Sequence, residues 1–485
     1  MKILIVWPDI ESNARYEVNM GISLISAILK NAGHEALLFK PDKFSEKEFL
    51  SKIREYNPNL VGFSTTTHQY QYAIKYAELL KQVKNIPIIF GGFHPTLAPE
   101  SVISNPAVDI VCRGEGEFAI LELINALEKD KDYSQISNLW VKKKNGEIIK
   151  NPLRKLIGDL DSLPFVDREF IYQEEILKNN GYRLDIAVGR GCPYNCPYCC
   201  NSALRELYKD NGQFIRLRSV DNVLRELNII LQKYKVKEIH FQDDMFLLNK
   251  EWFREFADKY AKNYHIPFHI SARVEHVDEE TARLLKQAGC ISITIGVESG
   301  DEQLRKTVLN KHISNEKILE TKKLLEKFKI KLCSLNMIGI PGETTQMAQK
   351  TLDFNKKLNP DWLACSIFSP YPGTQLYKLC EEKGFLNKDF NHFSSSYLDE
   401  KSASILNLPT ISEKEIIAGH RKFMNFAMKK YIKTKYPFWS PFYSIVSPLL
   451  ETPLREILIK IGKFLIFDKG KFKKTIQMTK VLLVH

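Results

Sequence analysis

The chain has 485 residues, 44% of them hydrophobic and 26% charged, which is typical of soluble globular proteins and long enough for two or three domains. Nine cysteines are too few for a disulfide scaffold, we expect no leader peptide before MKILIVWPDI, and there is no apolar run of about 18 residues. We therefore expect a reducing, cytoplasmic setting, where clustered thiols more often hold a metal than form disulfides. The net charge of +12 is concentrated in residues 421–485, which hold 14 Lys and Arg and only three acidic residues. The nearly neutral remainder argues against a nucleic-acid-binding main body.

The first part of the chain alternates buried-strand patterns with helical patterns. Strands are predicted for residues 2–8, 35–39, 59–67, 86–92 and 108–114, with helices such as 21–34 and 71–84 between them. This alternation predicts an α/β fold with a parallel, doubly wound sheet over roughly residues 1–130. A hairpin turning at Asn145–Gly146 and a linker interrupted by Pro164 are expected to follow.

The alternation begins again after residue 183. Strands are predicted for residues 184–189, 237–242, 267–271, 291–297, 331–339 and 363–368, separated by amphipathic helices. Six β/α units in about 190 residues predict a partial barrel, because a complete eight-unit barrel needs ~250 residues. The remaining sequence is expected to be helical, basic and aromatic. The predicted domains are 1–135, a hairpin and linker over 136–180, 181–385, and a helical region over 386–485.

Four cysteines are gathered in the sequence GRGCPYNCPYCCN, residues 189–201, directly after the first predicted barrel strand. Cys192, Cys196 and Cys199 have the spacing C-x₃-C-x₂-C, which lets several thiolates converge on one iron–sulfur cluster. A structural zinc site would need a fourth ligand, and a C-x-x-C redox pair would leave Cys192 unexplained. The side chain of Cys200 is expected to diverge from that of Cys199. Small buried hydrophobes are expected at Cys112, Cys290, Cys333, Cys365 and Cys380.

The cysteine motif resembles the signature of the radical S-adenosylmethionine (SAM) superfamily, C-x₃-C-x-aromatic-C, with Tyr198 at the aromatic position. The resemblance implies a [4Fe–4S] cluster held by Cys192, Cys196 and Cys199, with one iron open to chelate SAM. One electron from the cluster would then cleave SAM to methionine and a 5′-deoxyadenosyl radical. Zinc binding and plain electron transfer remain the alternatives.

Polar and glycine-rich sequences follow each of the six predicted strands, where β/α barrels place their chemistry. By the resemblance, Asp243 and Asp244 would lie beside the SAM ammonium, and Arg273 would pair with the SAM carboxylate. Glu298 would accept hydrogen bonds from the ribose. Residues expected beside the adenine are Met337, Ile338 and Gly339. The structural alternatives are helix capping for the aspartates, ion pairs for Arg273 and Glu298, and a turn for the glycine.

Three loops of the N-terminal sheet, STTTHQY, GGFHPTLAPE and CRGEGE, resemble the cobalamin-binding domain fused to one branch of this superfamily. The resemblance implies a Rossmann-like B12-binding domain whose corrin pocket is lined by Ser64, Thr65, Gly91, Gly92, His94 and Glu115. No G-x-G-x-x-G follows the first strand, and no D-x-H-x-x-G supplies a cobalt-ligating His. Cobalamin would therefore bind base-off without a His at that position, or the pocket is empty. His94 is left to ligate the cobalt, to contact the corrin, or to cap a turn.

The basic tail, residues 421–485, interleaves cations with aromatic side chains. Two interpretations fit this pattern: a helical cap over the barrel mouth with a solvated basic face, and peripheral contact with a membrane in which these aromatics lie at headgroup level: Trp439, Phe442, Tyr443, Phe464 and Phe467. An acidic partner is the third alternative.

Together the resemblances imply a cobalamin-dependent radical SAM enzyme, most simply a C-methyltransferase that acts on an unactivated carbon. The cofactors would be a [4Fe–4S] cluster, SAM and cobalamin, and no catalytic residue is assigned beyond the cluster ligands. Expected partners are an external electron donor of the flavodoxin or ferredoxin type and a small-molecule substrate, with a lipid or isoprenoid favoured and no nucleic acid. The protein is expected in the cytoplasm, peripherally on the inner face of the membrane. The alternatives are a cyclase or rearrangement enzyme without methyl transfer, and a non-catalytic cluster or corrin sensor.

Overall fold

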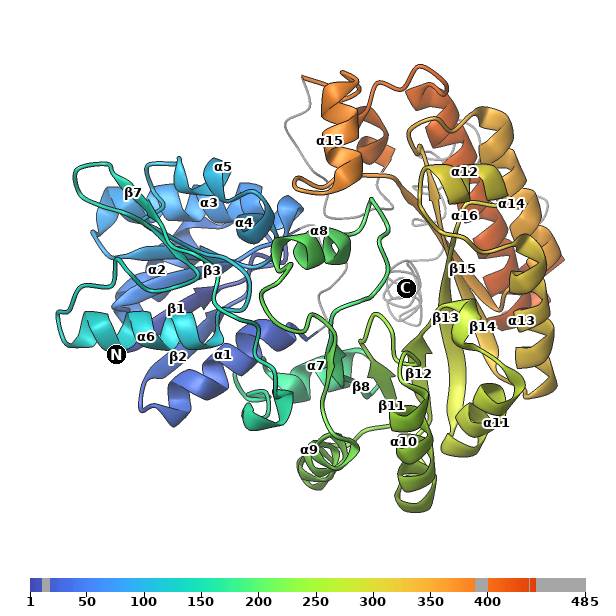
Figure 1. Ribbon diagram of the computed structural model, residues 1–485, viewed down its shortest axis with the longest axis horizontal. Coiled ribbons are helices and arrows are strands. Elements are labelled where there is room, and N and C mark those ends of the chain that lie inside the picture. Colours follow the sequence, from blue (N-terminus) through green and yellow to red (C-terminus); the bar gives the residue numbers. More distant parts are fainter. Residues whose placement is uncertain (11–17, 389–399, 436, 442–485) are drawn as a thin grey trace. The chain divides into compact units, whose positions relative to one another are not determined.

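The computed structural model describes residues 1–10, 18–388, 400–435 and 437–441 (Figure 1). The described chain divides into two compact units. The first unit comprises residues 1–244 and 370–379, and the second comprises residues 245–369, 380–388 and 400–441. Each unit is described below by itself.

The first unit contains a seven-stranded sheet in the order β2-β1-β3-β4-β5-β6-β7. Its strands are β1 Lys2–Val6, β2 Glu35–Phe39, β3 Leu60–Ser64, β4 Ile88–Gly91, β5 Ile110–Cys112, β6 Leu139–Lys142 and β7 Ile148–Lys150. The first five strands pair in parallel, and β6 and β7 add antiparallel strands at one edge. All five strands predicted for the N-terminal domain are confirmed, as is the hairpin that turns at Asn145–Gly146.

Helices cover both faces of this sheet (Figure 1). One face packs against α2 Glu46–Tyr56, α3 Thr67–Val83 and α5 Pro99–Ile103, and the other against α1 Met20–Asn31, α6 Glu117–Glu128 and α7 Gln173–Asn179. Buried apolar side chains line both faces, so the central strands β1, β3, β4 and β5 are nearly continuous apolar runs, as parallel sheets require. This is the doubly wound α/β architecture that the alternating pattern predicts.

Helices begin directly after two of the strands at the carboxyl edge of the sheet. Helix α4, Phe93–Leu97, starts two residues after β4, and α3 starts three residues after β3. The start of α3 is a capping box in which the Gln69 side chain accepts the backbone N–H of Thr66 at 3.0 Å. Such a box contributes about 1 kcal/mol and holds the preceding loop in place.

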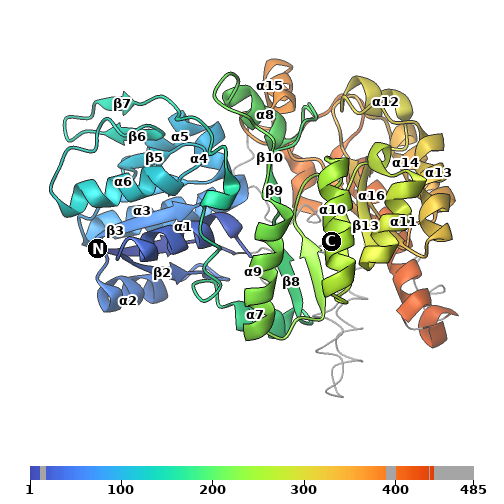
Figure 2. The same ribbon diagram turned by 60° about the horizontal axis from the view of Figure 1, so that its bottom comes forward.

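A second parallel sheet has the order β15-β14-β13-β12-β11-β8, and Figure 1 labels its six strands. Figure 2 shows β8 and β13 in a view turned by 60°. Its strands are β8 Arg183–Ile186, β11 Glu238–Phe241, β12 Phe268–Ser271, β13 Cys290–Glu298, β14 Lys331–Ile338 and β15 Trp362–Ile367. All six match the strands predicted for the barrel. Strands β8 and β11 belong to the first unit, and β12 to β15 belong to the second.

Helices follow the strands of this sheet in the predicted alternation. They are α8 Cys200–Leu207, α9 Val220–Lys233, α10 Lys250–Asn263, α11 Glu279–Ala288, α12 Glu302–Thr307, α13 Asn315–Lys327, α14 Thr345–Leu358, α15 Gln375–Glu382 and α16 Glu413–Lys435. In the second unit, α14 and α16 pack on the apolar face of β14 and β15. The carboxyl ends of the strands therefore carry loops that are anchored on both sides by buried secondary structure.

The sequence patterns do not predict a short antiparallel ribbon, β9 Gly189–Arg190 with β10 Arg216–Leu217. It lies in the first unit, immediately before the four-cysteine stretch. Of the tail, only residues up to 441 are described, so the predicted headgroup residues Phe442, Tyr443, Phe464 and Phe467 lie outside the described residues, and no description covers the Trp439 side chain. Within the described ranges, no helix combines the length and apolarity needed to cross a bilayer.

Candidate active site

The three predicted cluster ligands lie on one loop, residues 191–199, called here the thiol loop, between β9 and α8. Cys196 is buried, Cys192 and Cys199 are half-buried, and all three are free thiols. The backbone N–H of Cys199 donates to the carbonyl of Cys196 at 3.0 Å, and the Ser202 hydroxyl donates to the Asn195 side chain at 2.5 Å. The loop is thus shaped by its own hydrogen bonds.

The donor set fits an iron–sulfur cluster. Among the described residues, no three His, Cys, Asp or Glu side chains converge closely enough for a single metal ion. Each corner of a [4Fe–4S] cluster takes its own thiolate, so its ligands need not meet at one ion. Cys192, Cys196 and Cys199 would hold three corners.

Cys200 differs from the expectation. Its thiol donates to the sulfur of Cys199 instead of diverging from it, and together with the backbone N–H of Asn201 it lowers the pKa of Cys199 to about 7. The reason is local: Cys199 is the extended residue before α8, and Cys200 is the first residue of that helix. Side chains do not alternate across such a junction as they do along a strand. Cys199 is thereby favoured as a thiolate, the form that ligates iron.

Asp243 and Asp244 follow β11 but have different surroundings. Asp243 is buried, and its carboxylate accepts the backbone N–H groups of Val188 and Gly189 at 3.0 and 2.6 Å. Asp244 is exposed, accepts from the Asn201 side chain at 2.8 Å, and acts electrostatically on the thiols of Cys192 and Cys199. Asp243 thus fixes the backbone before the thiol loop, whereas Asp244 presents a carboxylate beside the thiols, the better placement for an ammonium group.

Tyr198, at the aromatic position of the motif, lies on the thiol loop and is half-buried. Asn201 is a polar neighbour of this loop that sequence reasoning missed. Asn201 stands directly after the fourth cysteine, and this position next to the cysteine motif is the feature of the sequence that indicates it.

Glu298 ends β13 in the second unit with an unusual backbone. Its φ of 64° lies in the left-handed region, and the β13–β14 register shifts between Gly296 and Glu298. Because Gly296 has no side chain, the Glu298 carboxylate and the Lys311 ammonium fit into the space that a Cβ would fill. Lys311, which sequence reasoning missed, pairs with Glu298 at 3.1 Å. Bulges and left-handed residues are concentrated at functional sites.

Arg273 lies just before a short 3₁₀ turn, Val274–His276, and its guanidinium pairs with Glu275 at 2.6 Å. The structure therefore contains the ion pair that was one alternative for this residue. Its assignment to the SAM carboxylate stays a prediction.

The predicted adenine residues end β14. Ile338 is buried against α16, Met337 is half-buried on the opposite face of the strand, and Gly339 has a φ of 83°. The following loop is held by Glu343, whose carboxylate accepts the N–H groups of Gly339 and Ile340 at 2.6 and 3.3 Å. Ile338 can thus offer only its backbone to a ligand, while the side chain of Met337 is available.

The predicted corrin residues lie at the carboxyl edge of the first sheet, where doubly wound folds bind ligands. Ser64 ends β3, and the Oγ1 atom of Thr65 is buried without a hydrogen-bond partner in the described chain. At Gly92, with a φ of 99°, a Cβ would lie 2.7 Å from the carbonyl oxygen of Thr65. At Gly91 an added Cβ would make an ordinary van der Waals contact with the Cβ of Cys112, at 3.8 Å.

His94 is buried in α4, and its ring contacts that of Tyr70 in a tilted arrangement, with ring centroids 4.5 Å and planes 33° apart. Burial lowers the pKa of His94 to about 4, so its imidazole is neutral at physiological pH. Its Nδ1 atom lies 3.3 Å from the Thr67 hydroxyl, and no described group hydrogen-bonds to its Nε2 atom. Orphaned buried polar atoms at His94 and Thr65 and a glycine cradle at the same edge fit a bound polar ring system such as the corrin.

Two aromatic side chains at this edge were missed. Phe93 follows Gly92 and is 49% exposed, and Phe118, in the first turn of α6, is 39% exposed. Exposed aromatics beside a glycine-rich edge offer apolar surface to a flat ring. Phe93 stands within the GGFHPTLAPE motif, and Phe118 directly follows the CRGEGE motif.

The Glu115 carboxylate is engaged by the protein itself. It accepts from Arg190 at 2.6 Å, from Arg216 at 2.8 Å and from the backbone N–H of Ile157 at 2.9 Å. Its assignment to the corrin pocket stays a prediction. The remaining five cysteines are all buried, as predicted.

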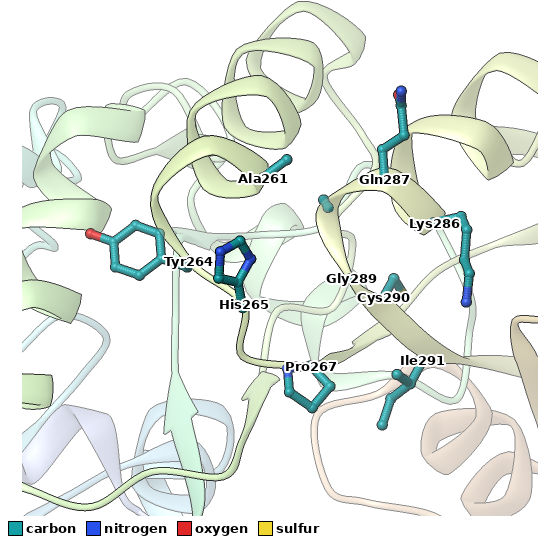
Figure 3. Close-up of a pocket in the computed structure, with 10 residues that line it drawn as sticks. Ala261, Tyr264, His265, Pro267, Lys286, Gln287, Gly289, Cys290 and Ile291 are labelled. Atoms are coloured by element: carbon teal, nitrogen blue, oxygen red, sulfur yellow. The ribbon is translucent and has the colours of Figure 1, made fainter.

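An open hollow of ≈ 290 Å³ lies elsewhere in the second unit (Figure 3). Its lining residues, including Tyr264, His265 and Lys286, come from the ends of α10 and α11 and the starts of β12 and β13. This is the amino end of the strands, away from the loops described above, and in β/α folds that end serves stability.

Comparison with protein families matches two parts of the chain. Residues 11–124 match the B12 binding domain, and residues 186–354 match the radical SAM superfamily. The chain belongs to the radical SAM superfamily and carries an N-terminal B12-binding domain. Its cofactors are accordingly a [4Fe–4S] cluster, SAM and cobalamin, and it is a cobalamin-dependent radical SAM enzyme.

Curated relatives cover most of the chain. An uncharacterized methyltransferase, PH0819, of Pyrococcus horikoshii is 30% identical over 78% of this chain and 83% of its own length. An anaerobic magnesium-protoporphyrin IX monomethyl ester cyclase of Rubrivivax gelatinosus is 24% identical over 79% of this chain and 70% of its own. A hopanoid C-3 methylase of Methylococcus capsulatus is 23% identical over 77% and 70%.

Two solved structures share the fold. The cobalamin-dependent SAM radical enzyme OxsB with aqua-cobalamin bound has a TM-score of 0.70 at 17% identity, covering 100% of this chain and 79% of its own. The radical SAM methyltransferase TsrM of Kitasatospora setae, with cobalamin and a [4Fe–4S] cluster bound, has a TM-score of 0.64 at 15% identity, covering 79% and 75%.

Proposed function

We propose that the protein is a C-methyltransferase that acts on an unactivated carbon of a small molecule. The observation that carries the reaction type is the 30% identity to the Pyrococcus methyltransferase over 78% of the chain. When bound, the cluster and SAM supply a hydrogen-abstracting radical, and cobalamin supplies the methyl group. An external electron donor is also required.

The residues of the first unit have two tasks in this reaction. Cys192, Cys196 and Cys199 would hold the cluster, and the exposed carboxylate of Asp244 would orient the SAM ammonium beside it. The edge formed by Thr65, Gly92 and its neighbours would bind the corrin. Because proximity governs the yield of radical chemistry, these two loops must be held in fixed places.

In the second unit, the Glu298–Lys311 pair supports SAM binding. Lys311 is 6% exposed and Glu298 12%, so the ammonium holds the carboxylate in one position with little solvent screening. The backbone of Gly339, pinned by Glu343, would face the adenine. Each group here binds or orients; none is assigned a proton transfer.

The products of SAM distinguish this proposal from its alternatives. Methyl transfer consumes two SAM molecules, one to 5′-deoxyadenosine and one to S-adenosylhomocysteine. We expect anaerobic reactions with reductant and a small-molecule extract to release the two in equal amounts, with deuterated methyl groups from labelled SAM appearing in an extract component. A cyclase, as in the Rubrivivax relative, would release 5′-deoxyadenosine alone, and a sensor would release neither; both outcomes would refute the proposal. The variant with Cys192, Cys196 and Cys199 all changed to Ala should lose its iron and release neither product; retention of iron would refute the ligand assignment.

For the substrate we propose a lipid or isoprenoid. The support is the basic aromatic tail, residues 421–485, and the presence of a hopanoid methylase among the relatives. Mass spectrometry of lipid extracts from cells with and without the protein tests it. A labelled methyl group found only in water-soluble compounds would refute it.

A further inference from the structure

An ion network in the first unit joins the corrin edge to the thiol loop. Arg190, two residues before Cys192, donates to Glu115 at 2.6 Å through Nη1 and to Glu117 at 2.5 Å through Nη2. Glu115 lies in the loop after β5, and Glu117 is the first residue of α6; residues 112–117 are called here the corrin-side loop. One guanidinium therefore ties both carboxylates of this loop to the strand that leads into the thiol loop.

A second arginine completes the network. Arg216 faces Arg190 across the β9–β10 ribbon, as its register partner. Two cations placed opposite one another on a ribbon repel each other. Glu115 lies between them, 2.8 Å from Arg216 and 2.6 Å from Arg190, so its charge holds the two strands together.

The backbone of the corrin-side loop is held as well. The N–H of Glu115 donates to the Tyr208 hydroxyl at 3.1 Å, and Tyr208 ends the helix that begins at Cys200. Gly114 has a φ of 74°, and a Cβ there would lie 1.6 Å from that hydroxyl. The glycine is therefore required for the loop to approach α8 so closely.

The network is shielded from solvent and balanced in charge. Arg216 is 5% exposed and Glu117 6%, with Glu115 at 13% and Arg190 at 27%. Two cations face two carboxylates. Removing one member of such a group leaves an uncompensated charge in a poorly hydrated place, which costs far more than breaking a surface pair.

We propose that Glu115 and Arg190 are positioning residues that hold the corrin-side loop in fixed register with the thiol loop. The glutamates of the CRGEGE motif then act by setting the spacing of the two cofactor loops. This inference needs both cofactor loops but does not depend on methyl transfer, so it survives if the proposed reaction is wrong.

Hydrogen–deuterium exchange on the full chain with its cluster in place tests the coupling. Glu115→Gln keeps the shape of the side chain and removes the charge between the arginines. We expect amides of both the corrin-side loop and the thiol loop to exchange at least about tenfold faster. The matched control is Glu122→Gln on α6, whose exposed bidentate pair with Arg154 (3.0 and 2.8 Å) is a surface contact that contributes little. Exchange in the control should equal that of the wild type.

Two further variants separate coupling from a loss of folding. Arg190→Lys keeps the charge but cannot span both carboxylates, so an intermediate increase is expected. In the double variant Glu115→Gln with Arg190→Met, the amide exchange rate of the two loops should be only slightly higher than in the faster of the two single variants, because the two residues act through each other. If Glu115→Gln does not fold, Glu117→Gln, which removes one of the two Arg190 contacts, replaces it.

Pulsed dipolar EPR gives a readout that a merely stabilising role would not move. In protein loaded with reduced cluster and cob(II)alamin, the distance distribution between the two paramagnets should broaden in Glu115→Gln and stay narrow in Glu122→Gln. Unchanged exchange in the thiol loop, an unchanged distance distribution, or equal effects in the control would overturn the proposal.

Discussion

The loop after β14 contains a buried carboxylate, Glu343, which should make folding stability depend measurably on pH. Glu343 is 0% exposed, one of its oxygens accepts the N–H groups of Gly339 and Ile340, and the other has no hydrogen-bond partner among the described residues. Burial, only partly offset by these hydrogen bonds, raises the pKa of Glu343 from 4.5 to about 7. The ionised form is therefore disfavoured in the folded protein.

The sign and size of the effect follow from linkage. Because the pKa of Glu343 is higher in the folded state than in the unfolded chain, the folded state binds more protons between pH 4.5 and about 7. Folding stability must fall as the pH rises through this interval, by roughly 3 kcal/mol at most. A glutamine at this position has no proton to lose in this pH interval, so it does not cause that decrease in folding stability.

We therefore expect the unfolding free energy of Glu343→Gln to increase relative to that of the wild type as the pH rises. Between pH 5 and pH 8 the difference in unfolding free energy should grow by about 2 kcal/mol in favour of the variant, or on the order of 5 °C in the unfolding midpoint. Anaerobic thermal unfolding of both proteins at each pH measures it. Glu320→Gln, an exposed change on α13 in the same unit, is the control and should shift nothing. If the difference in unfolding free energy between Glu343→Gln and the wild type is the same at pH 5 and pH 8, the assignment of a raised pKa to Glu343 is refuted.

Two other predictions concern ligand affinity. Gly92→Ala would place a methyl group 2.7 Å from the Thr65 carbonyl oxygen at a φ of 99°, so we expect at least about tenfold weaker cobalamin binding by absorbance titration. The control is Gly158→Ala, where no atom lies near the added methyl group, and it should bind cobalamin normally. Equal cobalamin affinity in both variants would contradict the assignment of this edge to the corrin. Lys311→Met leaves the Glu298 carboxylate without its cation, so SAM binding by equilibrium dialysis should weaken about tenfold and be partly restored in Lys311→Arg. Wild-type affinity in Lys311→Met would show that the pair does not support the SAM site.

The strands of both sheets are predictable because each is a short segment, either apolar throughout or with buried apolar side chains at alternate positions, and helical patterns lie between them. The ribbon β9–β10 is not, since two residues per strand carry no periodicity. The tie between Glu115 and Arg190 joins residues 75 positions apart, and no local pattern records it. The thiol loop was found because its ligands are neighbours in sequence, whereas Lys311 is brought to Glu298 only by the fold. The expectation that the side chain of Cys200 diverges from that of its neighbour Cys199 is wrong because a helix begins at Cys200.

The Arg190 network also limits how the protein can be recombined with its relatives. A hybrid that takes its first 150 residues from another member of the superfamily would replace Glu115 and Glu117, the carboxylates that pair with Arg190 and Arg216. Residues 189–217 would have to come from the same parent protein as the N-terminal segment, so that the proposed contacts between the two cofactor loops are kept. Exchange points for engineered hybrids therefore belong after residue 217, well beyond the apparent end of the first sheet.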